Sequence, residues 1–153
     1  YTNDSETDDV ANGVVDFDHF ITQKNCDLVV KSIGLKHPGG AFGYSFNIGS
    51  KKVVIALDNE FDFDMETDLV RFCQNADILL WDGMYTKEEI TNKKGWGHST
   101  VEQAIYFTKK SNVKKIVICH HSPTRSDDEI DAMKANMIGK NVEFGIEGTK
   151  FSL

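Results

Sequence analysis

Residues that commonly bind metals follow three apolar segments of this 153-residue chain. His37 follows Leu28–Lys36, Asp58 follows Lys51–Leu57, and His120 follows Lys114–Cys119. These segments have the composition of β-strands, and strand ends at one edge of a sheet lie close in space. Imidazole and carboxylate ligands together suit zinc, manganese or iron. The three residues are therefore candidate metal ligands.

Two further residues are candidates for acid–base chemistry at the same edge. Asp82 follows a fourth apolar segment, Asp77–Trp81, and His98 directly precedes a helix start. A helix N-terminus attracts phosphate, and a carboxylate can orient a histidine and fix its tautomer. We therefore expect Asp82 and His98 to act as a pair beside the metal ligands.

Each of these residues also has an ordinary structural interpretation. His37 precedes Pro-Gly-Gly and fits a surface turn, while Asp58 and Asp82 fit turn or cap positions. His98 is also compatible with a purely structural role as the residue that precedes a helix cap. His120 and His121 are adjacent and point in different directions, so at most one of them is expected to be a ligand. The shared placement at strand ends favours the functional interpretation.

The hydrophobic pattern predicts an α/β fold with a mixed β-sheet and flanking helices. The expected strands are Cys26–Lys36, Ala41–Ile48, Lys52–Leu57, Asp77–Trp81 and Lys115–Cys119, with a terminal hairpin of Val142–Phe144 and Thr149–Leu153. Helices are expected at Asp64–Asn75, from Thr86, from Ser99 to about Lys110, and from Ser126, the last three each opening with a capping box. The two strand–helix–strand crossovers are long enough to join parallel neighbours. Hairpins are expected near both ends of the sheet.

The charge of the chain is concentrated at its beginning. The net charge is −7, and the first 20 residues hold six acidic residues and no Lys or Arg, which leaves −1 for the remainder. Residues 1–10 are expected to be a solvated acidic lead-in, and residues 11–153 the domain. An acidic chain does not favour extended binding to nucleic-acid backbones, because such binding needs clustered cations.

Cysteine content, hydrophobic runs and the first residue indicate the cellular environment of the protein and its relation to a longer chain. Three scattered cysteines without CxxC spacing indicate a reducing cytoplasm. No apolar run approaches 18 residues and no signal peptide is visible, so no membrane contact is expected. The chain opens on Tyr rather than Met, and we expect a processed or excised piece of a longer protein.

Five motifs together resemble one known family. They are His37-Pro38-Gly39-Gly40-Ala41-Phe42-Gly43-Tyr44, Ala56-Leu57-Asp58-Asn59-Glu60, Ala76–Tyr85, Gly95-Trp96-Gly97-His98-Ser99-Thr100 and Cys119-His120-His121-Ser122-Pro123. In order and spacing they resemble the C-terminal half of metallo-β-lactamase-fold hydrolases, in the branch of ribonuclease Z and cyclic-nucleotide phosphodiesterases. The resemblance runs from about Leu28 to Met133.

The resemblance implies a role for each candidate residue. His37 and His120 would be terminal ligands of two different divalent ions, zinc first and manganese or iron as alternatives, with Asp58 bridging them. His98 would be a proton donor or phosphate contact near the leaving oxygen, oriented by Asp82. The family pattern assigns the ligand role to His120 rather than His121. Asn59 departs from the family, which usually has Thr after the bridging Asp.

One part of the family pattern is missing. The family draws its other ligands from an HxHxDH motif in its N-terminal half, and this sequence contains no such motif. The family fold is a four-layer αββα sandwich, of which this chain would supply one sheet with its helices. The inner face of that sheet would then need a partner, either the N-terminal half or a second copy of the chain.

The resemblance implies a metal-dependent hydrolase. A phosphodiester is a suitable substrate for two close divalent ions, because its non-bridging oxygens can coordinate metal. An acidic chain with no basic insertion between Tyr44 and Asp58 fits a small cyclic nucleotide better than a long RNA. With half of its ligands absent, this chain alone is expected to be inactive. The alternative is a non-catalytic α/β interaction or regulatory module with an incomplete metal site.

Overall fold

The computed structural model describes residues 27–137 and 141–153. Six strands form one mixed sheet in the order β1-β2-β3-β4-β5-β6. Their bounds are β1 Leu28–Leu35, β2 Ala41–Ile48, β3 Lys51–Ala56, β4 Ile78–Asp82, β5 Ile116–Cys119 and β6 Val142–Phe144. The first three strands pair antiparallel, and β3 to β6 pair parallel. The expected α/β class with a mixed sheet is confirmed. The acidic lead-in at residues 1–10, the domain boundary at residue 11 and Cys26 lie outside the described residues.

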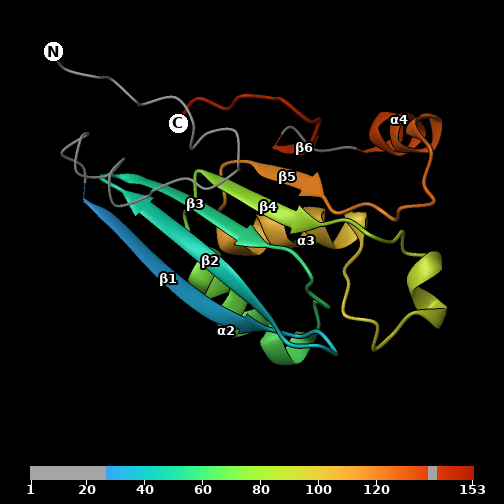
Figure 1. Cartoon of the computed structure of the whole chain (residues 1–153), viewed down its shortest axis with the longest axis horizontal. Helices are drawn as coiled ribbons and strands as arrows, with labels where there is room; N and C mark the ends of the chain where they lie inside the picture. Colours follow the sequence, from blue (N-terminus) through green and yellow to red (C-terminus); the bar gives the residue numbers. More distant parts are fainter. Residues whose placement is uncertain (1–26, 138–140) are drawn as a thin grey trace, which may run out of the picture.

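Four helical segments connect or flank the strands: α2 Phe63–Cys73, the 3-10 helix η2 Glu89–Asn92, α3 Val101–Ser111 and α4 Asp127–Asn136. Figure 1 shows α4 and the short helix after β4 beyond the edge of the sheet at which β3, β4 and β5 end. Among the helices of the described residues, none combines the length and apolar character that a membrane span requires.

Capping side chains start the helices, although not always where the sequence pattern suggested. Ser126 and Glu129 form the predicted capping box at the start of α4. The cap of α3 is Thr100 with Gln103, so the prediction of Ser99 as the cap is wrong. Thr86 and Glu89 exchange the contacts of a capping box, yet only a 3-10 turn follows them.

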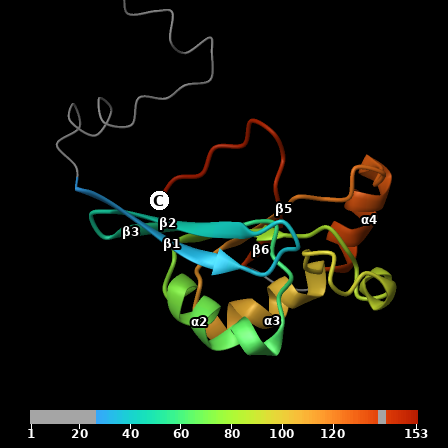
Figure 2. The same cartoon turned by 60° about the horizontal axis from the view of Figure 1, so that its bottom comes forward.

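One face of the sheet carries the core. Val54 and Ala56 of β3 and Trp81 of β4 are fully buried in one cluster with Leu69 of α2 and Phe107 of α3. Figure 2 shows α2 and α3 together on this side of the sheet. The burial of Val54, Ala56 and Trp81 fixes which face of each strand points inward, because strand side chains alternate between the two faces.

The opposite face of the sheet is open in the described part of the chain. Strand alternation and register place Val30, Phe42, Tyr44 and Ile48 on this face, and each is at least 40% exposed. Figure 2 shows the segment after β6 on this side, while α4 lies beyond the edge of the sheet. In residues 27–137 and 141–153, α2 and α3 cover one face of the sheet, and no helix covers the other.

The C-terminal part differs from the predicted hairpin. Val142–Phe144 pairs parallel with β5 after the crossover through α4, and residues 149–153 form no strand. A three-residue strand carries too little pattern to reveal its direction, and the α4 crossover permits a parallel neighbour. Hairpins therefore occur only at the N-terminal end of the described sheet.

Candidate metal centre

The candidate residues come from loops at one edge of the sheet. Asp58 lies two residues beyond β3, Asp82 is the last residue of β4, and His120 directly follows β5. These three strands run parallel, so their carboxyl ends meet at the same edge (Figure 1). His37 follows β1, which points toward the same edge, and His98 precedes α3.

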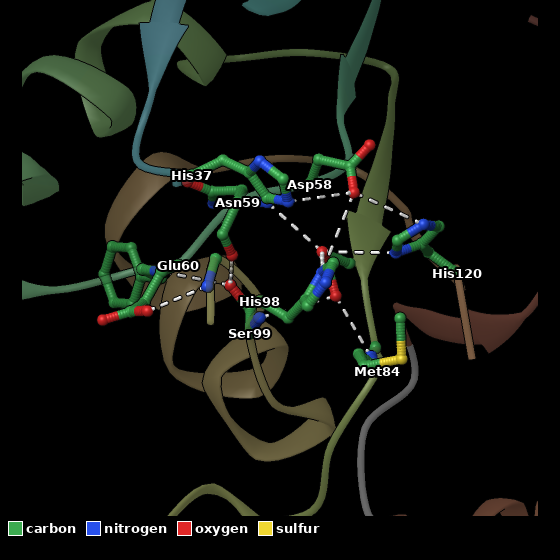
Figure 3. A network of polar contacts seen from close by, with 12 residues as sticks. His37, Asp58, Asn59, Glu60, Met84, His98, Ser99 and His120 are labelled. Carbon is green, nitrogen blue, oxygen red and sulfur yellow. Dashed lines mark hydrogen bonds and ion pairs between the residues drawn. The ribbon is translucent and has the colours of Figure 1, made fainter. Parts of the chain in front are cut away.

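The structure brings four of the five predicted residues into one compact cluster. One ligand atom from each of Asp58, Asp82, His98 and His120 lies within 4.8 Å of every other. His37 lies outside this group, on another side of Asp58: its Nε2 is 3.8 Å from Asp58 Oδ1, and its ring centroid is 5.4 Å from that of His98. Figure 3 shows His37, His98 and His120 around the Asp58 carboxylate.

The spacing of these donors fits a metal better than direct hydrogen bonds. Asp58 Oδ1 lies 3.5 Å from His120 Nε2 and 3.8 Å from His37 Nε2, both too long for a hydrogen bond. Two ligands held about 2.1 Å from a tetrahedral ion lie about 3.4 Å apart. His120 Nδ1 is buried without a hydrogen-bond partner, 3.4 Å from Asp82 Oδ2. The donor set therefore fits a divalent metal, while the individual ligand roles stay predictions.

Backbone conformation also sets two of these residues apart. Asp58 has φ 53° and His120 has φ 58°, in the left-handed region that non-glycine residues rarely adopt. The other two non-glycine residues with positive φ in the described chain, Asn75 and Asn112, are of the type that tolerates this region best. Such strain at a strand end is typical of functional sites, where the surrounding structure holds a side chain in place.

His98 and Asp82 form the closest ionisable contact of the cluster. His98 Nδ1 lies 2.9 Å from Asp82 Oδ2, and the Asp82 carboxylate is fully buried. Asp82 also accepts hydrogen bonds from the backbone amides of Asn59, at 3.2 Å, and Met84, at 3.1 Å. A fixed, buried carboxylate on Nδ1 leaves Nε2 of His98 as the nitrogen that can meet a substrate.

His121 lies apart from the cluster, as expected. Its ring stacks on Phe144 with centroids 5.4 Å apart, and its Nδ1 lies 3.3 Å from the Gly83 carbonyl oxygen. Burial lowers the pKa of His121, which favours a neutral ring. His121 is thus placed as a wall residue, and His120 is the one of the pair that faces Asp58.

Sequence reasoning missed the residues that hold the loops together. The Glu60 carboxylate is buried and accepts hydrogen bonds through Oε2 from the backbone amides of Gly95, at 2.7 Å, and Gly97, at 3.0 Å. The Ser99 hydroxyl accepts from the Phe61 amide and donates to the Asn59 carbonyl oxygen. These contacts join the loop after β3 to the loop that carries His98 (Figure 3).

No protein-family model matches the chain. Ribonuclease Z of Archaeoglobus fulgidus is 40% identical over 63 residues, which cover 39% of this chain and 19% of that protein. Ribonuclease Z of Clostridium perfringens is 23% identical over 170 residues, covering 80% of this chain and 52% of that protein. Even the longer of these two matches therefore spans only about half of the relative.

Solved structures share the fold at low sequence identity. The short form of human tRNase Z has a TM-score of 0.60 and 22% identity, covering 81% of this chain and 45% of its own. The metallo-β-lactamase-fold protein YhfI from Bacillus subtilis has a TM-score of 0.65 and 16% identity, covering 80% and 48%. Zinc-bound PqqB from Methylobacterium extorquens has a TM-score of 0.56 and 14% identity, covering 85% and 51%.

These matches agree with the five motifs and with the observed sheet. About half of each of the three solved chains is covered, and the curated relatives are named ribonuclease Z. The chain therefore shares the fold of metallo-β-lactamase-fold proteins, and its sequence is similar to part of ribonuclease Z.

Proposed function

We propose that the complete protein is a metal-dependent phosphodiesterase, and that this chain is the C-terminal half of its catalytic domain. The observation that carries this proposal is the arrangement of His37 and His120 around Asp58, with the His98–Asp82 pair adjoining. The ribonuclease Z relatives support hydrolysis of a phosphodiester as the reaction class.

His37, Asp58 and His120 would hold two divalent ions together with ligands from an N-terminal half. Zinc is the first choice for this donor set, with manganese or iron as alternatives. Two such ions lower the pKa of a bound water and neutralise charge on a phosphodiester. The HxHxDH motif that would complete the site is absent from this sequence, so the chain alone would bind metal weakly and be inactive.

His98 would donate a proton to the leaving oxygen. Asp82 accepts from Nδ1 and stabilises the imidazolium, so Nε2–H of the charged ring can face the substrate. The same positive charge would offset the anionic transition state. In this arrangement Asp82 is a positioning residue and His98 the catalytic one.

The substrate is proposed to be a small nucleotide phosphodiester, with a cyclic nucleotide as the leading candidate. The net charge of −7 and the absence of a basic insertion between Tyr44 and Asp58 support a small substrate. RNA is the second candidate, because the curated relatives are named ribonuclease Z. Turnover of a 2′,3′-cyclic nucleotide and of a short single-stranded RNA by the same preparation separates the two.

The open face of the sheet supports the proposed division of the catalytic domain into halves. Val30, Phe42, Tyr44 and Ile48 present an apolar surface of the kind that needs cover in a sandwich. We propose that the N-terminal half packs its own sheet there, with a second copy of the chain as the alternative. The non-catalytic module is disfavoured, because such a module has no need of the strained Asp58 and His120 at one edge.

The cysteines support a cytoplasmic location. Cys73 and Cys119 are free, and burial raises the pKa of the Cys73 thiol to about 12, which keeps it protonated and unreactive. A reducing compartment suits such thiols.

The proposed function is tested with the full-length protein, including the N-terminal half, loaded with zinc or manganese. Hydrolysis of bis(p-nitrophenyl) phosphate and of a 2′,3′-cyclic nucleotide is expected. His98→Ala should lower cyclic-nucleotide turnover by about 10²- to 10⁴-fold. It should lower bis(p-nitrophenyl) phosphate turnover far less, because p-nitrophenolate leaves without a proton. Absence of turnover with zinc, manganese and iron would refute the proposal.

A further inference from the structure

Trp96 is an exposed indole two residues before His98. The other tryptophan of the chain, Trp81, is fully buried and donates from Nε1 to the Thr100 carbonyl oxygen, whereas Trp96 is 56% exposed. Isolated exposed aromatic residues are common on protein surfaces, so exposure alone assigns no role. The role of Trp96 is inferred instead from the loop that carries it.

The backbone on both sides of Trp96 is held by hydrogen bonds. The amides of Gly95 and Gly97 both donate to Oε2 of Glu60, a carboxylate in a residue only 6% exposed, and the Trp96 amide donates to the Lys93 carbonyl oxygen at 3.1 Å. Three successive amides are therefore fixed. A fixed backbone presents the indole with little conformational freedom left to lose on binding a ligand.

The same loop borders the candidate metal centre. A Cβ added to Gly97 would lie 2.2 Å from His37 Cδ2, so the Gly97 backbone lies directly against the His37 imidazole. His98 follows as the proposed proton donor. Trp96 is thus next in the chain to a residue that touches a proposed metal ligand, and this makes part of the bound substrate the expected occupant of the indole face.

Positive charge accompanies the indole. Lys93 Nζ lies 3.9 Å from the centroid of the Trp96 ring, a cation–π contact. Lys94 lines a cavity of about 280 Å³ that His98 also lines. An aromatic platform with ammonium groups suits a ligand that has both a π-face and a phosphate, which is the chemistry of a nucleotide.

We propose that Trp96, backed by Lys93, is a stacking platform for the nucleobase next to the scissile phosphate, and is thereby a specificity-determining residue. This inference rests on the proposed phosphodiesterase function. It adds a preference for nucleoside esters over esters that lack a base.

The kinetic test compares two esters with the same leaving group in the full-length, metal-loaded protein. Thymidine 5′-(p-nitrophenyl phosphate) carries a base, and methyl p-nitrophenyl phosphate does not. Trp96→Ala should reduce the preference in kcat/KM for the thymidine ester by roughly 5- to 150-fold, and Trp96→Phe should retain part of it. Phe63→Ala removes an aromatic side chain that is 81% exposed on α2, and this control should leave the preference unchanged.

A binding measurement separates this inference from the proposed function. Calorimetric titration with thymidine 5′-monophosphate and with methyl phosphate requires no turnover. Selective loss of thymidine monophosphate affinity in Trp96→Ala would support the platform even if neither ester were hydrolysed. Absence of thymidine monophosphate binding to the unaltered protein, or an equal effect of Trp96→Ala on both ligands, would overturn it.

Discussion

Replacing Gly97 by alanine should damage the candidate site through a single methyl group. Gly97 has φ 91°, and Gly95 in the same loop has φ 86°. Because of this positive φ, alanine at either position should lower the free energy of unfolding by a similar amount, about 1–2 kcal/mol. The two positions differ in their surroundings: the new Cβ at Gly97 would lie 2.2 Å from His37 Cδ2 and 2.7 Å from Pro38 Cδ, whereas the new Cβ at Gly95 has nothing within 4 Å.

The clash sets the size of the effect. Ordinary contact begins at 3.4 Å, so the His37 ring and the loop must separate by about 1.2 Å. A displacement of about 1 Å in a catalytic constellation costs about 10²-fold in rate. Because His37 is a proposed ligand, its displacement should lower zinc affinity as well as the catalytic rate.

Gly95→Ala is the matched control for this prediction. In the full-length protein both variants should lose free energy of unfolding in urea, and Gly97→Ala should lose about 1–3 kcal/mol more because of the overlap with His37 and Pro38. Only Gly97→Ala should lose about 10²-fold in kcat/KM and bind zinc more weakly in a chelator competition. Equal losses of activity in the two variants, or unaltered zinc affinity in Gly97→Ala, would refute the role given to the contact with His37.

Three further outcomes are expected. Asp82→Asn should reduce kcat by about 10²-fold or more and change the pH profile of activity, since it removes the carboxylate that stabilises the His98 imidazolium; a profile like that of the unaltered protein would argue against the pairing. Asp77→Asn should lower the free energy of unfolding by about 1–3 kcal/mol at pH 7. Hydrogen bonds from Lys114 Nζ and the Lys52 amide hold the pKa of Asp77 below 3.8, so this contribution is present above pH 3.8 and is lost as the pH falls through the lowered pKa. Urea unfolding of both proteins at pH 7 and near pH 3 should show the difference shrinking, and a constant difference would contradict the assignment. The 153-residue chain on its own should self-associate in analytical ultracentrifugation through its open sheet face, while a well-behaved monomer would contradict the need for cover.

The strand ends could be predicted from the sequence because buried parallel strands read as short apolar runs. The structure has β2 at Ala41–Ile48, as predicted, and the other principal strands shift by only one or two residues at either end. Since β3, β4 and β5 run parallel, their ends had to meet at one edge. The proximity of Asp58, Asp82 and His120 follows from this topology alone.

Other features depend on tertiary contacts that no local pattern records. Ser99 and Thr100 are both good helix caps, and the structure uses Thr100 because the Ser99 hydroxyl is bonded to the loop after β3. Glu60 is a lone acidic residue without periodic context, so its two hydrogen bonds to the Gly95–Gly97 loop could not be anticipated. Asn59 is fully buried, and its side-chain amide has no partner among the described residues.

The proposed metal centre can be located directly by the positions of bound zinc ions. Crystals of the zinc-loaded full-length protein would be measured on both sides of the zinc absorption edge. Anomalous peaks are expected about 2.0–2.2 Å from a carboxylate oxygen of Asp58 and from Nε2 of His120, with a second ion bound by His37. Zinc bound through His121, or no zinc in contact with Asp58, would contradict the proposed metal centre.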